Sequence, residues 1–196
     1  MKLQVKKIYL YAKNEFGIKR HRRIAIARVS KIVPSKKKCM KVVLAGIGKT
    51  SEEFIKTGIS IYESRIKHYH PFESVFLPDL KNARSLPLEM QKQKEGEMLL
   101  KLLLPNDFVV LLDENGQSLD SVAFSKFLQQ QFASASRRLV FLIGGPYGFS
   151  DEVYKKAGSK ISLSAMTFSH QLIRLVFLEQ LYRANTILKG EPYHHA

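Results

Sequence analysis

The amino-acid sequence predicts an α/β fold in which a mainly parallel sheet is flanked by helices. Short runs of apolar residues alternate along the chain with longer segments in which apolar residues recur every three or four positions. The short runs are typical of strands and the longer segments of amphipathic helices. Strands that are apolar at nearly every position are typical of a parallel sheet covered on both faces. At 196 residues with 45% hydrophobic content, the chain is long enough to build one core.

The first half of the chain is expected to form two strands, a helix between them and a polar loop. In order, these elements are the strand 42–45, the helix 51–69, the strand 72–77 and the loop 79–84. Ser51 is the expected N-cap of the helix, because serine is favoured there and two acidic residues follow it. Pro71 stops the helix and Pro78 closes the second strand.

The second half is expected to continue the alternation of helices and strands. In order, its elements are a helix between Ser85 and Leu104, the strand 108–112, the helix 121–132, the strand 139–143, a helix beginning at Ser150, a short strand from Ile161 that breaks into a small-residue loop, and the helix 170–188. The apolar side of the first of these helices holds Met90, Met98, Leu99, Leu102 and Leu103.

The positive charge of the protein is concentrated in its first 39 residues. They hold 13 lysines and arginines against the single acid Glu15, a net charge of +12 out of the +15 of the whole chain. We expect residues 1–39 to be a disordered basic extension and residues 40–196 to be one domain. Three interpretations of the extension stay open: a start codon assigned upstream of the true start at Met40, a basic arm for RNA, or a targeting peptide.

The composition also indicates the cellular compartment and predicts that the protein has neither a membrane span nor a metal site. The single cysteine, Cys39, allows no internal disulfide and fits a reducing compartment. No apolar run reaches the roughly 18 to 20 residues of a membrane span, so we expect a cytoplasmic protein with no membrane partner. No metal is expected, since the two histidine pairs, 68 with 70 and 194 with 195, lack supporting ligands.

The strand 139–143 runs into a glycine-rich turn, residues 144–148, with the sequence Gly-Gly-Pro-Tyr-Gly. Open α/β sheets bind ligands just past the carboxyl ends of their strands, and glycines let the backbone come close to a ligand. A small-molecule pocket is therefore predicted here, with a mere tight connection as the alternative. The turn is not a dinucleotide fingerprint, because the next helix begins only at Ser150.

Four motifs taken together resemble one known family. They are Ile-Gly-Gly-Pro-Tyr-Gly at 143–148, Leu-Ser-Ala-Met-Thr-Phe-Ser-His-Gln at 163–171, Leu-Tyr-Arg-Ala at 181–184 and Glu-Pro-Tyr-His at 191–194. In this order they resemble the bacterial large-subunit rRNA methyltransferase H family, which belongs to the SPOUT class. Two further stretches are similar to some of its members: Pro-Asp-Leu-Lys-Asn at 78–82 and Lys-Glu-Gly-Glu at 94–97. The resemblance covers residues 40–196.

The resemblance implies a C-terminal trefoil knot that binds S-adenosylmethionine among three loops. By correspondence, the residues that bind this cofactor are Leu112, Gly144, Leu163, Ser164, Ala165, Met166, Thr167 and Phe168. Small residues among them suit an apolar cleft in which adenine is read by backbone groups. The implied reaction transfers the methyl group to the N3 nitrogen of a pseudouridine in the 23S rRNA hairpin that faces the decoding centre.

Such a transfer needs a group that favours loss of the N3 proton and groups that hold the RNA. Arg183, Tyr193 and His194 are the expected catalytic residues, with Arg174 and His170 as further candidates. Several relatives have Arg or Lys where this chain has a second histidine, at 195, which weakens the case for a tail cation there.

A homodimer with 23S rRNA as its partner is expected. The helix 170–188 is apolar over more of its circumference than one sheet can cover, which favours a subunit interface. The resemblance adds that cofactor and RNA are held by different subunits. The alternative function is a non-catalytic RNA-binding module that uses the basic arm at residues 1–39.

Overall fold

The structure is a computed structural model that describes residues 39–81, 83–134 and 136–193. The expected basic extension, apart from Cys39, and the candidate catalytic residue His194 lie outside these ranges. The description below concerns the unit that begins at Lys38.

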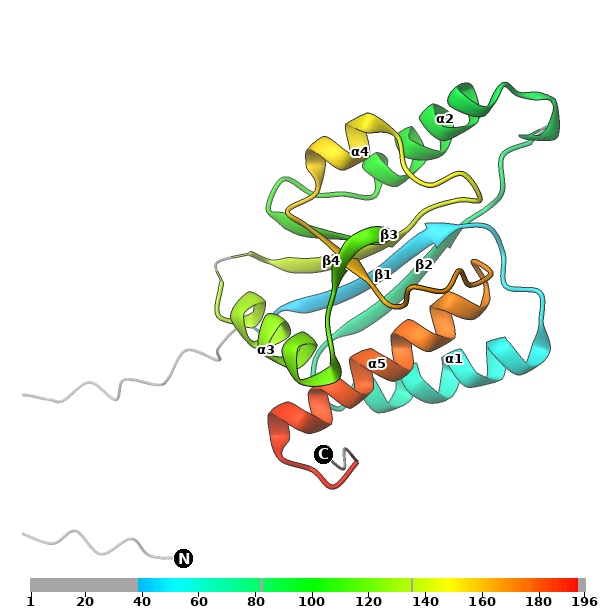
Figure 1. Ribbon diagram of the computed structural model, residues 1–196. Coiled ribbons are helices and arrows are strands. Elements are labelled where there is room, and N and C mark those ends of the chain that lie inside the picture. Colours follow the sequence, from blue (N-terminus) through cyan, green and yellow to red (C-terminus); the bar gives the residue numbers. More distant parts are fainter. Residues whose placement is uncertain (1–38, 82, 135, 194–196) are drawn as a thin grey trace, which may run out of the picture. The chain divides into compact units, whose positions relative to one another are not determined.

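The centre of the fold is a five-stranded sheet in which every described pair of strands is parallel (Figure 1). The strand order is β2-β1-β4-β3-β5. Their bounds are β1 Lys41–Ile47, β2 Phe72–Leu77, β3 Asp107–Ser118, β4 Arg138–Ile143 and β5 Ser159–Ser162. The predicted α/β class with a parallel sheet is confirmed.

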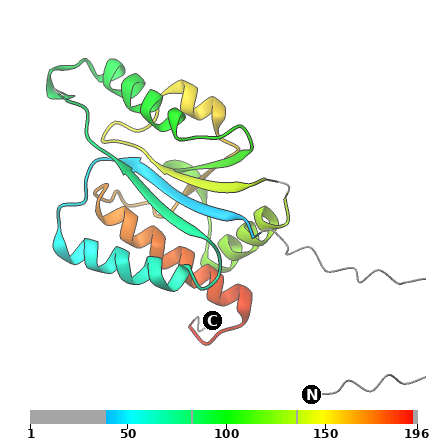
Figure 2. The same ribbon diagram turned by 180° about the vertical axis from the view of Figure 1, so that it is seen from behind.

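Helices cover both faces of the sheet. Their bounds are α1 Glu53–Ile66, α2 Leu88–Lys101, α3 Ser121–Phe132, α4 Asp151–Lys156 and α5 Leu172–Lys189, and a 3-10 turn spans Ala83–Ser85. Helices α2 and α4 lie on one face, and α1, α3 and α5 on the other, as Figures 1 and 2 show from opposite sides. None of these helices combines the length and the apolar character that crossing a membrane requires.

Alternate side chains of each strand enter the two layers between sheet and helices, as the pleat of a strand requires. On β1, Leu44 packs in the cluster formed with α1, α3 and α5, and Val43 packs in the cluster formed with α2 and α4. At the centre of the larger cluster the rings of Phe141 and Phe177 lie 4.6 Å apart, and both are fully buried. Replacing either phenylalanine by alanine would lower the free energy of unfolding by about 3–5 kcal/mol.

Helix α3 starts where the sequence predicts, whereas helix α1 does not. Helix α3 has its predicted bounds, and Asp120 caps it by accepting a hydrogen bond from the Ala123 amide at 2.6 Å. Helix α1, however, has Glu52 rather than Ser51 at its N-cap position, with no cap from that side chain. The prediction for Ser51 was wrong because the cap comes from the distant residue Gln171.

Helix α2 also departs from its predicted apolar face. Met90, expected to face inward, is 43% exposed, whereas Gln91 and Glu95 are buried. Only Leu99, in the second half of the helix, enters the core fully. The first half faces the glycine-rich turn instead of the sheet, and its inward side chains are therefore polar.

Candidate active site

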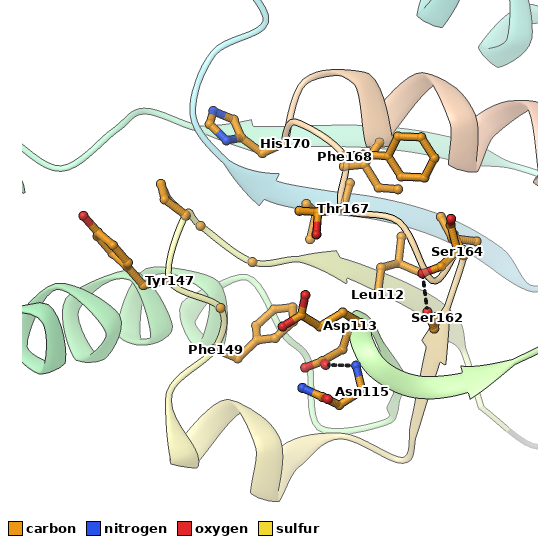
Figure 3. Close-up of a pocket in the computed structure, with 18 of the residues that line it drawn as sticks. Leu112, Asp113, Asn115, Tyr147, Phe149, Ser162, Ser164, Thr167, Phe168 and His170 are labelled. Atoms are coloured by element: carbon orange, nitrogen blue, oxygen red, sulfur yellow. Dashed lines mark hydrogen bonds between the residues drawn. The ribbon is translucent and has the colours of Figure 1, made fainter.

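A pocket of about 660 Å³ opens at the carboxyl ends of β4 and β5, beside the point in β3 where its pairing with β4 ends (Figure 3). Three segments line it: residues 112–115 on β3, residues 143–149 from the end of β4 onward, and residues 162–164 and 166–170 from the end of β5 onward, with Tyr154 and Ile173 completing it. Since the strands are parallel, their carboxyl ends meet at one edge of the sheet, which is where open α/β sheets bind ligands. The volume lies within the usual range for small-molecule sites.

The glycine-rich turn, residues 144–148, can keep its shape only with glycine at two positions. Gly148 has a φ of 82°, which side-chain-bearing residues rarely adopt, and its amide donates to the Gly145 carbonyl oxygen at 3.1 Å. A Cβ on Gly144 would lie 3.1 Å from both the carbonyl carbon and oxygen of Gly148. The turn is thus closed on itself, and it leaves backbone rather than side chain on the pocket wall at 144.

Helix α2 supports this turn from the side away from the pocket. A Cβ on Gly145 would lie 2.1 Å from Oε2 of Glu95, and a Cβ on Gly96 would lie 2.2 Å from Oγ of Ser150. Two glycines therefore let the helix, the turn and the start of α4 approach one another closely. This contact gives a structural reason for the Lys-Glu-Gly-Glu stretch at 94–97, to which the sequence alone assigned no role.

The segment after β5 is folded by hydrogen bonds of its own serines. Ser162 Oγ donates to the carbonyl oxygen of Ser164 at 3.0 Å, and the amide of Met166 donates to Ser164 Oγ at 2.8 Å. Of the eight residues expected to bind the cofactor, the structure brings seven to the pocket wall: Leu112, Gly144, Leu163, Ser164, Met166, Thr167 and Phe168. Ala165 is exposed and is not part of that wall.

Asp113 gives the pocket a fixed negative charge that the sequence did not reveal. Its Oδ1 accepts from the Asn115 amide at 2.8 Å and its Oδ2 accepts from the Tyr154 hydroxyl at 2.5 Å. Burial, and then the hydrogen bond to this carboxylate, raise the pKa of Tyr154 to about 12, so the phenol stays a donor. A carboxylate held this way suits a ligand that carries a positive charge.

The predicted catalytic residues Arg183 and Tyr193 form a second group, centred on Glu179. Arg183 donates to Glu179 Oε1 from Nη2 at 2.6 Å and from Nε at 3.1 Å, and the Tyr193 hydroxyl donates to the same oxygen at 3.2 Å. The Arg183 guanidinium also lies over the Tyr193 ring, 4.9 Å from its centroid. The hydrogen bond to Glu179 raises the pKa of Arg183, which stays a cation.

This Glu179 group does not reach the pocket of its own subunit. Arg183 lies 11 residues beyond the start of α5 at Leu172, which is about 16 Å along the helix axis. Figure 1 shows α5 starting near the carboxyl ends of the strands and ending far from them. Glu179 was missed from the sequence, although its spacing of four residues from Arg183 is a signal for an ion pair on one helix face.

The further candidate Arg174 is structural. It is fully buried, and it donates to the carbonyl oxygen of Ile47 and to Thr50 Oγ1, both at 2.7 Å. Its guanidinium lies 4.1 Å from the centroid of the Phe76 ring. These contacts fasten the first turn of α5 to the end of β1. His170, in contrast, is exposed and lines the pocket. Across residues 39–193, excluding the positions left undescribed, no cluster of three potential metal ligands is found.

Comparison with known proteins identifies the family. The model of a family described as predicted SPOUT methyltransferase matches residues 40–194. "Ribosomal RNA large subunit methyltransferase H" of Parabacteroides distasonis is 54% identical over 156 residues, which is 80% of this chain and 99% of that protein. The protein of the same name from Christiangramia forsetii is 55% identical, with the same coverage of both chains.

Among solved structures, the SpoU methyltransferase AviRb from Streptomyces viridochromogenes, in complex with the cofactor AdoMet, matches at 13% identity with a TM-score of 0.39. That match covers 81% of this chain and 64% of the other. So distant a likeness does not indicate which ligand or reaction this chain has. The relatives above are close and match over nearly their whole length. The chain therefore belongs to the SPOUT methyltransferases and, within them, to the ribosomal RNA large subunit methyltransferase H family.

Proposed function

We propose that the protein transfers the methyl group of S-adenosylmethionine to the N3 nitrogen of a pseudouridine in 23S rRNA, in the large-subunit hairpin that faces the decoding centre. The observation that supports this proposal most strongly is the pocket formed by the middle of β3 and the carboxyl ends of β4 and β5, in a chain of this family. A ribosomal substrate also supports the cytoplasm as the place of action.

The residues of the pocket fit the cofactor in shape and in charge. Leu112 and Leu163 supply apolar surface for adenine, and Gly144 leaves a stretch of backbone free of side chain beside it. The Asp113 carboxylate, fixed by two hydrogen bonds, supplies a negative charge for the cationic end of the molecule. When bound, S-adenosylmethionine supplies an electrophilic methyl group on a positively charged sulfur.

The task of the protein is to hold the base with its N3 proton removed. A cation beside the base stabilises the deprotonated, anionic form. Arg183 is suited to this role, because Glu179 and Tyr193 fix its guanidinium and its remaining nitrogen–hydrogen bonds can point to RNA. His194 is proposed to act beside it, as the next residue after Tyr193.

Because the Glu179 group lies away from the pocket of its own subunit, we propose that a second copy brings it to the pocket. Helix α5 retains half-buried apolar side chains that the single subunit leaves partly uncovered: Leu172, Ile173, Leu175, Val176, Ile187 and Leu188. Beside it, Phe54 and Ile61 on α1 are 65% and 46% exposed. An apolar surface shared by two packed helices supports a homodimer interface.

Methyl transfer can be tested directly with large ribosomal subunits that lack the modification. The purified protein and labelled S-adenosylmethionine should place one methyl group per subunit at N3 of the pseudouridine, as measured by mass spectrometry of rRNA fragments. A methyl group on another nucleotide would refute the proposed target. RNA binding without saturable S-adenosylmethionine binding would instead support the non-catalytic alternative.

A further inference from the structure

A second pocket, of about 740 Å³, lies on the α2 side of the glycine-rich turn. Its lining includes Asp79 after β2, Gln91 and Glu95 on α2, and Pro146 and Tyr147 of the turn. Pro146 and Tyr147 also line the first pocket, so the two pockets share one wall. A ligand in the second pocket would therefore lie next to a ligand in the first.

On the α2 side, this second pocket is lined by two polar side chains that are buried. Gln91 is 7% exposed and Glu95 is 4% exposed, and Gln91 Nε2 donates to Glu95 Oε1 at 2.9 Å. Glu95 Oε2 has no hydrogen-bond partner among the described residues, and burial raises the pKa of Glu95. Burying such groups costs free energy unless they are fully hydrogen-bonded. Buried polar groups beside a surface pocket are typical of a ligand site.

The shared wall presents an aromatic ring to solvent. Tyr147 is 50% exposed and lines both pockets. An exposed ring of this kind is a platform on which an unpaired nucleobase can stack, with a gain of about 1–3 kcal/mol per base.

We infer that the second pocket binds the RNA nucleotide adjacent to the methylated one, with its base stacked on Tyr147 and its exocyclic amino group donating to an oxygen of Gln91 or Asp79, while Glu95 holds the Gln91 amide in place. This inference rests on the proposed methyl transfer to rRNA. The second pocket thereby fixes the strand while the target base occupies the first.

The chemistry of the lining determines which base fits. Gln91 directs its amide nitrogen at Glu95, which leaves its amide oxygen as an acceptor, and Asp79 adds an exposed carboxylate. Adenine, cytosine and guanine each carry an exocyclic amino group that can donate to these oxygens, whereas uracil has none, and its N3–H lies between two carbonyl oxygens that the acceptors of the pocket would repel. The carboxylates also disfavour a phosphate in this pocket, so a base rather than the backbone enters it.

The test is a cycle that combines substitutions in the enzyme and in the RNA. Large subunits are prepared with each nucleotide flanking the target replaced in turn by uridine, and kcat/KM is measured for wild type, Gln91→Leu and Glu95→Gln. For wild type, one of the two replacements should lower kcat/KM about fivefold, the effect of one lost hydrogen bond. In Gln91→Leu or Glu95→Gln this penalty should largely disappear, with unchanged affinity for S-adenosylmethionine.

Two further variants keep the test decisive. Glu97→Gln, on the same helix but exposed, is the matched control and should retain the full uridine penalty. Asp79→Ala, which alters an exposed residue, addresses the same pocket if the buried variants fail to fold. A penalty that is equal in wild type and in the pocket variants, or absent throughout, would overturn the inference. Failure of wild type to methylate unmodified subunits would instead refute the proposed function itself.

Discussion

The side-chain oxygen of Gln171 lies 2.7 Å from the backbone nitrogen of Ser51 and caps helix α1 from 120 residues away. The same oxygen accepts from the Glu52 amide at 3.4 Å, and Gln171 Nε2 donates to Ser51 Oγ at 3.0 Å. Gln171 directly follows the segment 162–170 that lines the first pocket. One amide group thus joins the start of α1 to the end of a pocket segment, and Arg174 fastens the next turn to β1.

Gln171→Ala should therefore destabilise the protein and weaken cofactor binding together. The lost cap should lower the free energy of unfolding by about 1–2 kcal/mol, as measured by urea denaturation. Calorimetry should show a weaker affinity for S-adenosylmethionine, because the pocket segment loses its anchor. Gln129→Ala, at an exposed position of α3, is the control and should change neither quantity.

Gly144→Val should abolish cofactor binding while the secondary structure survives. The added Cβ would press on the Gly148 backbone at 3.1 Å, and such crowding costs about 1–3 kcal/mol. That cost falls on the turn rather than on β4, which ends at Ile143. Gly190→Ala, at a φ of 66° in the C-cap of α5, should lower stability by about 1 kcal/mol and leave affinity unchanged. Unchanged affinity in a folded Gly144→Val protein would exclude Gly144 from the cofactor site.

Glu179→Gln should lower kcat without changing the affinity for S-adenosylmethionine. Glutamine keeps the shape of the side chain but removes the anion that fixes Arg183 and Tyr193. Loss of this orientation should slow methyl transfer on the order of tenfold to a hundredfold in single-turnover assays. Glu63→Gln, which removes the charge of the half-buried partner of Lys67 on α1, should retain the wild-type rate. Equal rates for both variants would mean that Glu179 has no part in positioning.

Mixed dimers can test whether the active site is shared between subunits. One subunit carries Gly144→Val and the other carries Arg183→Ala with His194→Ala. If pocket and Glu179 group come from different subunits, the mixed dimer retains one intact site and should recover up to about half of the wild-type rate. No recovery, with both parent homodimers folded and dimeric, would place both groups in the same subunit.

The stability of the protein should fall as the pH drops below about 6.5, in part because of His70. Burial, followed by the charge of Lys189, lowers the pKa of His70 from 6.5 to about 4. The unfolded chain binds a proton in this interval while the folded protein does not, so stability is complete above pH 6.5 and is lost toward pH 4. At 1.36 kcal/mol per pH unit, the loss amounts to about 3 kcal/mol.

His70→Phe should flatten this part of the pH profile in urea denaturation, since a second ring can pack against Phe132, which lies 4.6 Å from the imidazole. Replacing exposed His68 is the control and should leave the acid-induced loss in place. A loss of equal size in wild type and in His70→Phe would show that other groups cause it.

The elements that local sequence determines were predicted well. Helix α3 has its predicted bounds, since its cap Asp120 directly precedes it and its apolar spacing lies within its own residues. The core of β4 was likewise evident, because burial on both faces requires apolar residues at consecutive positions. Most of the pocket wall followed from the motifs at 143–148 and 163–171. The trefoil knot stays a prediction that rests on family resemblance.

Features that depend on distant contacts were not predictable. Strand β3 was expected to end at Leu112, but it continues to Ser118 through polar residues that are typical of a turn. It pairs with β5 both before and after a register shift between Leu112 and Gln117, and a Cβ on Gly116 would lie 2.6 Å from the backbone of Ile161. Tertiary pairing here overrides local preference. The positions of Gln171 and Glu95 depend in the same way on partners far along the chain.

The order of strands in the sheet also determines when the fold can form during synthesis. Of the strands in the described residues, β1 is the first to be made, yet its central neighbour β4 begins 97 residues later, at Arg138 opposite Lys41. Until then β1 can pair only with β2, and one edge of an apolar strand stays open on the nascent chain. Pairings that span so much sequence form slowly. The growing polypeptide should therefore remain dependent on chaperones until most of its length has been translated.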